Sequence, residues 1–182
     1  MKNLLIIDLE STCFERGKEP PRFFSEIIEI GAVVLNTSTF TIIDEFQTCI
    51  KPTVFPILSD FCKNLTTITQ EEADNGLSIS QAIKDIHSFS KKHEALFSSW
   101  GFYDKKQFQQ VCTYFRLPYP FADEHISIKH QHGSFYKKRA MGMEKALAMH
   151  NIPLDGTHHR GLDDAKNIAK LASQMIQDGW KF

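Results

Sequence analysis

LLIIDLE, residues 4–10, is the stretch that decides the fold, because four apolar residues lead directly into two acids one residue apart. A short, wholly apolar run predicts a buried strand, here residues 3–8. Side chains alternate along a strand, so Asp8 and Glu10 point to the same face. The pair fits either solvated acids at a strand end or a site for a divalent cation, which would relieve the repulsion between two crowded carboxylates.

The size and composition of the chain are those of an ordinary globular domain. At 182 residues it is long enough to bury a substantial core, and we expect one domain over residues 1–182. The 42% hydrophobic and 24% charged residues exclude a disordered or membrane protein. A net charge of −1 gives no overall attraction to nucleic acid. A polyanion would have to be held by local basic patches and bound cations.

The cysteines and the first residues bear on the compartment. The four cysteines contain no C-x-x-C pair, which argues against a disulfide framework or zinc site and favours a reducing compartment. Between Met1-Lys2-Asn3 and Asp8 there are only four apolar residues, too few for a signal peptide. No apolar run reaches membrane-spanning length. We therefore expect a cytoplasmic protein without a membrane segment.

The order of predicted elements indicates the fold class. Two apolar runs, 27–35 and 41–50, flank the polar segment 36–39 and predict a β-hairpin. Thr69-x-x-Glu72 and Ser78-x-x-Gln81 are typical capping boxes that start helices. The remaining predicted elements are strands over 95–100 and 125–129 and helices over 104–115, 142–150 and 161–177. Hairpin strands followed by alternating helices and strands predict an α/β fold, a mixed sheet flanked by α-helices.

The closing helix brings an acid and a histidine together. His159 and Asp164 are five residues apart, and the apolar stripe Ile168, Leu171, Ala172 and Met175 continues backwards to Asp164. The polar stripe of Gln174, Lys170 and Asn167 continues to Asp163, which we therefore expect to face solvent. By the simpler interpretation, Asp164 only interacts with the helix dipole and His159 is a surface histidine.

Two further positions allow a simple structural interpretation. Asp104 lies on the inner stripe of its helix, but Asp104-x-x-Gln107 is itself a capping-box pattern. The triplet His130-Gln131-His132 has no partner cysteines and is expected in a surface loop.

The ordered set of acids and the histidine resembles a known family. Asp8-x-Glu10, Asp104 and His159-x-x-x-x-Asp164 are similar to the three motifs of the DEDDh 3′–5′ exonucleases, the DnaQ-like branch of the ribonuclease H-like fold. The likeness runs from about residue 3 to 179 and is greatest to the Eri-type exonucleases of histone mRNA and small RNA and to bacterial KapD-type proteins. The segments that carry it are IDLESTC (7–13), EIIEIG (26–31), LSDFC (58–62), LTTIT (65–69) and GLDDAKNIA (161–169).

The resemblance implies a function and a site. Asp8, Glu10, Asp104 and Asp164 would bind two divalent cations, Mg²⁺ or Mn²⁺, and His159 would be the general base. The expected reaction releases nucleoside 5′-monophosphates from the 3′ end of a single-stranded nucleic acid, with RNA or short oligoribonucleotides favoured. A 3′–5′ DNA exonuclease and a non-catalytic nucleic-acid-binding module remain the alternatives.

The resemblance also nominates residues that contact the substrate. Thr12 follows the first motif, and Phe61 and Leu65 belong to the segment that surrounds the terminal nucleotide in the family. Both apolar residues fit equally well in the core of a short helix. Gly101-Phe102-Tyr103 separates Trp100 from Asp104, a longer spacing than family members often have, and one of the three aromatics there is a candidate to stack on a base.

Overall fold

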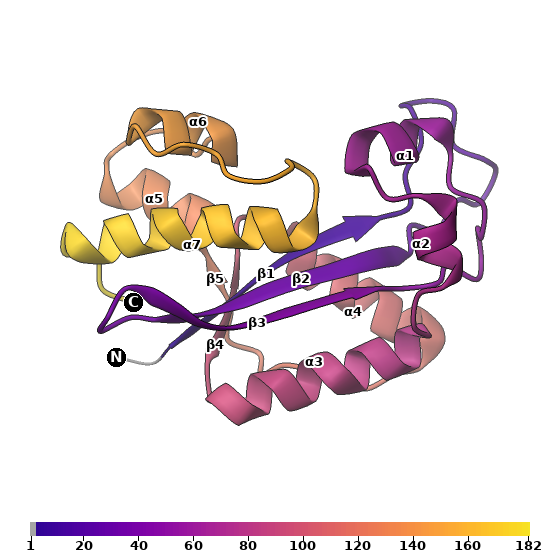
Figure 1. Cartoon of the computed structure of the whole chain (residues 1–182), viewed down its shortest axis with the longest axis horizontal. Coiled ribbons are helices and arrows are strands. Elements are labelled where there is room, and N and C mark those ends of the chain that lie inside the picture. The colour runs from indigo at the N-terminus through magenta and orange to yellow at the C-terminus, as the bar shows by residue number, and fades with distance from the viewer. Residues whose placement is uncertain (1–2) are drawn as a thin grey trace.

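The structure is a computed structural model that describes residues 3–182, so Met1 and Lys2 of the opening segment lie outside the described residues. It contains a five-stranded sheet with helices on both faces (Figure 1). The strands are β1 (Leu4–Ser11), β2 (Ile27–Asn36), β3 (Thr41–Cys49), β4 (Leu96–Ser99) and β5 (Ile126–Ser127). The helices are α1 (Asp60–Thr66), α2 (Gln70–Asp74), α3 (Ile79–His93), α4 (Tyr103–Phe115), α5 (Ile128–Phe135), α6 (Met143–Met149) and α7 (Gly161–Gln177).

The sheet is mixed and has the order β3-β2-β1-β4-β5. β1 pairs antiparallel with β2, which pairs antiparallel with β3. On its other edge β1 pairs parallel with β4, and β4 with β5. The predicted α/β class and the predicted hairpin are therefore confirmed, and β1, with its two acids, is the central strand.

Alternation along β1 separates two cores. Leu4 and Ile6 pack against α7 and its neighbours on one face. Leu5 and Ile7 pack with α3 and α4 on the other. Figure 1 shows α5, α6 and α7 on one side of the sheet and α3 and α4 on the other. Asp8 and Glu10 continue the even-numbered series, so they face α7.

A close approach of backbones fixes the start of α7 against the sheet. A β-carbon on Gly31 of β2 would lie 1.9 Å from the carbonyl carbon of Gly161. A β-carbon on Gly161 would in turn lie 2.9 Å from the carbonyl oxygen of Asp8. No larger residue fits at either position. The first turn of α7 can therefore lie directly over β1 and β2, beside the acids of β1.

Two of the predicted helix starts are confirmed, and two other local predictions need correction. The Thr69 capping box and the Ser78 cap are both present. The capping box at Asp104 is wrong, because α4 starts at Tyr103 without a side-chain cap. The surface loop predicted for the triplet is also wrong, because it lies in α5 and His132 is buried. A membrane-spanning helix is not present among residues 3–182.

Candidate active site

Three elements bring four acids to the edge of one cavity. Asp8 and Glu10 come from β1, Asp164 from the first turn of α7 and Asp104 from the first turn of α4. Together they line a cavity of about 470 Å³. One carboxylate oxygen from each of Asp8, Glu10 and Asp164 can be chosen so that all three lie within 4.8 Å of one another. Carboxylate oxygens gathered in this way suit a hard divalent cation.

Asp104 is fixed to the central strand. Its Oδ1 accepts a hydrogen bond of 3.1 Å from the backbone N–H of Leu9, the residue between the two acids of β1. The helix-capping partner expected from sequence, Gln107, instead donates to the carbonyl of Ser25 at 2.8 Å. Asp104 is therefore held beside Asp8 and Glu10 by the strand itself.

Burial and mutual repulsion raise the pKa values of three of the acids, Asp8, Glu10 and Asp104. Burial, then the charge of Asp164, raises the pKa of Glu10 to about 9. Removal from water, then Asp104 and Asp164, raises the pKa of Asp8 well above its usual value. Burial also raises the pKa of Asp104 to about 6. Without a cation the site favours protonated carboxyl groups, and a divalent cation would favour the ionised forms.

Both histidines of the 157–165 segment lie beside Asp164, not only the predicted one. The His159 backbone N–H donates to Asp164 Oδ2 at 2.9 Å, and its ring Nδ1 lies 4.0 Å from Glu10 Oε1. The Nδ1 of His158 lies 3.0 Å from both oxygens of Asp164, and the two rings stack with centroids 3.9 Å apart. No pattern in the sequence pointed to a contact for His158. The cause is the left-handed backbone of His159, at φ +65°, which spacing alone does not reveal.

The inward side predicted for α7 is confirmed at Asp164, whereas Asp163, expected to face solvent, is half-buried. Asp164 is buried and lines the cavity, whereas Asp163 does not line it and instead accepts the N–H of Thr157 at 2.8 Å. Asn167, expected on the solvent side, is buried instead. Its amide donates to the carbonyl of Asp155 at 2.8 Å, because the chain before His158 folds over this part of the helix.

The residues nominated for substrate contact lie in different places. Leu65 lines the cavity and is exposed. Phe61 is exposed on the same helix, α1, but does not line the cavity. Thr12 is buried, and its hydroxyl accepts the N–H of Glu26 at 2.9 Å, so it ties two loops together. Tyr103 and Lys129 also line the cavity, and no motif in the sequence pointed to Lys129.

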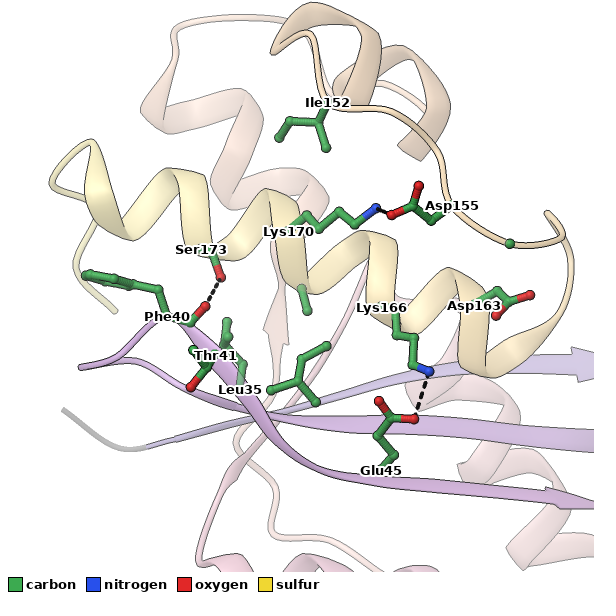
Figure 2. Close-up of a pocket in the computed structure, with 13 residues that line it drawn as sticks. Leu35, Phe40, Thr41, Glu45, Ile152, Asp155, Asp163, Lys166, Lys170 and Ser173 are labelled. Carbon is green, nitrogen blue, oxygen red and sulfur yellow. Dashed lines mark hydrogen bonds and ion pairs between the residues drawn. The ribbon is translucent and has the colours of Figure 1, made fainter.

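A larger hollow of about 800 Å³ lies on another side of α7, between that helix and the β2–β3 hairpin (Figure 2). Its two lysines are already paired: Lys166 lies 2.8 Å from Glu45, and Lys170 contacts Asp155. The acids of β1 and α4 do not line it. The smaller cavity, and not this one, holds the set of side chains suited to metal-dependent chemistry.

Comparisons with known proteins place this geometry in a family. The model of the RNase_T family, described as Exonuclease, matches residues 5–172. Human "3'-5' exoribonuclease 1" is 39% identical over 97% of this chain, which spans about half (53%) of that relative. "Probable 3'-5' exonuclease KapD" of Bacillus subtilis is 31% identical, and the match covers 97% of this chain and 85% of that protein.

A solved structure has the same fold. The nuclease domain of 3'hExo, described as a DEDDh family member bound to rAMP, superposes with a TM-score of 0.91 at 39% identity. The match covers 98% of this chain and 93% of the solved one.

Proposed function

We propose that this chain, which belongs to the RNase_T exonuclease family, is a metal-dependent 3′–5′ exoribonuclease. It would remove nucleoside 5′-monophosphates one at a time from the 3′ end of a single-stranded RNA or short oligoribonucleotide. The observation that carries this function is the meeting of Asp8, Glu10, Asp104 and Asp164 with His159 around one cavity. We also propose that residues 1–182 act as one domain. A cytoplasmic location is proposed because the cysteines of the described chain are free, as expected in a reducing compartment.

The four carboxylates fit a pair of divalent cations. Membership of the family implies divalent metal, and we propose two ions, Mg²⁺ or Mn²⁺, held by Asp8, Glu10, Asp104 and Asp164. The raised pKa of Glu10 supports the fit. It shows that the ionised form of this carboxyl group is unfavourable in the site without a positive charge, and a bound cation would supply that charge. When bound, such ions activate a water molecule and stabilise the leaving oxygen of a phosphodiester.

We propose that His159 accepts the proton of the attacking water. Burial, followed by the neighbouring His158, lowers the pKa of His159, so its ring is neutral at physiological pH and free to take a proton. The ring lies at the cavity, with its Nδ1 near Glu10, and the backbone N–H of His159 is bonded to Asp164. A general base within reach of the reacting water typically contributes about 10²–10⁴-fold to the rate.

The substrate contacts belong to the same proposal. Leu65 and Tyr103 offer apolar and aromatic surface at the cavity for a terminal base. Lys129, at the same cavity, offers a positive charge for a phosphate. Thr12 and Phe61 would act on the substrate indirectly, Thr12 by fixing the loop after β1 and Phe61 from the exposed side of α1.

RNA is favoured over DNA by the relatives. The human relative is named an exoribonuclease, and the solved domain is described as bound to rAMP. A matched pair of 5′-labelled RNA and DNA strands, incubated with Mg²⁺, Mn²⁺ or EDTA, tests the proposal directly. We expect RNA to shorten from its 3′ end with either metal and to stay intact in EDTA. Faster DNA degradation would favour a DNA exonuclease, and binding without degradation would favour a non-catalytic module.

A further inference from the structure

Glu29 is a carboxylate in an unusual place, the interior of β2. It is fully buried and sits directly opposite Glu10 of β1 in the sheet register. A buried charge is costly unless strong donors satisfy it. Its Oε2 accepts the backbone N–H of Gly161 at 2.7 Å, and its Oε1 accepts the guanidinium of Arg160 at 3.0 Å and the amide of Gln47 at 2.8 Å.

These bonds hold the first residue of α7. The residue at the N-cap position, Arg160, makes no side-chain cap, so the free N–H of Gly161 is satisfied from the sheet instead. A negative charge is also favourable at a helix N-terminus. Glu29 thus does for α7 what a capping residue does for other helices, while fixing the helix to β2.

Arg160 connects this anchor to a third element. One arm of its guanidinium binds Glu29, and the other lies 3.2 Å from Glu72 of α2. A planar guanidinium can bind two carboxylates in a fixed orientation, which an ammonium cannot. Both the side chain of residue 160 and the N–H of residue 161 are therefore held in place, immediately after His159.

His159 needs such support. Its backbone is left-handed, at φ +65°, a conformation that a residue with a side chain keeps only when its surroundings impose it. Within the loop, Arg160 N–H donates to Thr157 at 3.2 Å and His159 N–H to Asp164 at 2.9 Å. Arg160 itself does not line the cavity, so any effect it has on the reaction passes through its neighbours.

We propose that Arg160 and Glu29 are positioning residues that hold the His159 ring over the carboxylate cavity. The inference rests on the proposed exonuclease function, in which His159 is the base. Loss of either partner would free the left-handed turn and let the ring leave the cavity. The four acids would stay in place, because β1 and α4 hold Asp8, Glu10 and Asp104, and the first turn of α7, with Asp164, still packs at Gly161 against Gly31 of β2.

Steady-state kinetics on a labelled RNA strand test this role with full-length variants. For Arg160→Met we expect kcat to fall by about tenfold to a hundredfold, the scale of a misplaced catalytic group, with KM within about twofold of wild type. Arg160→Lys should recover part of that loss, and Glu29→Gln combined with Arg160→Met should be no worse than the more severe single change. The matched control is Lys166→Met, which removes an ion pair of the same helix to Glu45, away from its first turn.

Further measurements distinguish a displaced His159 ring from a general loss of stability and do not depend on the proposed activity. Calorimetric Mn²⁺ affinity should stay close to wild type in Arg160→Met. The melting temperature should fall, because the buried Glu29 carboxylate loses its guanidinium partner, so kinetics and spectra are recorded well below the melting temperature of the variant. The ring signals of His159 in an NMR spectrum should change from one ordered state to several, which is measurable without activity. If Glu29→Gln fails to fold, Arg160→Met and Glu72→Gln still break the cluster from its more exposed side.

Several results would overturn the positioning role. They are an unchanged kcat in a folded Arg160→Met variant, an equal loss of kcat in Lys166→Met, or unchanged NMR signals of the His159 ring in Arg160→Met. A wild-type protein that degrades no RNA would refute the proposed function, and the NMR comparison would then decide the positioning role independently.

Discussion

Metal binding should expel a proton from Glu10. With its pKa raised to about 9 by burial and by Asp164, most metal-free molecules carry this proton at about pH 7.5. A carboxylate must be ionised to bind a cation, so each binding event should release about one proton from this residue. Asp8, whose pKa is also raised, would add to that number.

Calorimetry in buffers of different protonation enthalpy measures the release. We expect at least about one proton per Mn²⁺-saturated molecule near pH 7.5. The Mn²⁺ affinity should therefore rise by about tenfold or more per pH unit below pH 9. Glu10→Gln should lower the release by about one proton, and Asp163→Asn, outside the cavity, should leave it unchanged. Release of less than about a third of a proton would show that Glu10 is already ionised and would refute the electrostatic account of the site.

The raised pKa of Glu10 also makes the stability of the metal-free protein depend on pH. The contribution of Glu10 to the free energy of unfolding is fully present below its unfolded pKa of 4.5 and is lost as pH rises through about 9. EDTA should therefore lower the melting temperature more at alkaline than at acidic pH.

Three other changes have separate outcomes. His159→Ala should lower kcat by about a hundredfold or more while calorimetric metal affinity survives, because the residue is assigned as base and not as ligand; an equal loss of affinity would make it a ligand. Asp164→Asn should weaken both Mn²⁺ binding and turnover, whereas Asp163→Asn should change turnover less than about threefold, and the reverse order would contradict the helix register. His132 is kept neutral because burial, then His150, lowers its pKa, so the free energy of unfolding should fall as pH drops below about 6.5, and His132→Phe should flatten that decline in urea titrations.

Local patterns predicted the sheet, the hairpin and the inward side of α7. Alternation along residues 4–10 placed Asp8 and Glu10 on one face, and helical periodicity chose Asp164 over Asp163, because both depend only on neighbouring residues. The structure agrees at each of these positions.

What the patterns did not predict depends on contacts between distant segments. The capping box at Asp104 failed because Leu9, 95 residues away in sequence, competes for its carboxylate. The contact of His158 with Asp164 follows from a left-handed turn, and the burial of His132 from packing beside His150. No spacing rule records a long-range hydrogen bond or a single unusual φ, so these features required the folded chain.

The most direct test of the central claim follows the two ends of one RNA strand. A single-stranded RNA labelled at its 3′-terminal nucleotide should release that nucleotide as a labelled 5′-monophosphate in the first turnover, whereas the same RNA labelled at its 5′ end should shorten as a ladder. Both reactions should require Mg²⁺ or Mn²⁺ and stop with Asp8→Asn. Cleavage of a circular RNA at a comparable rate, or first release of the 5′-terminal nucleotide, would contradict a 3′–5′ exonuclease.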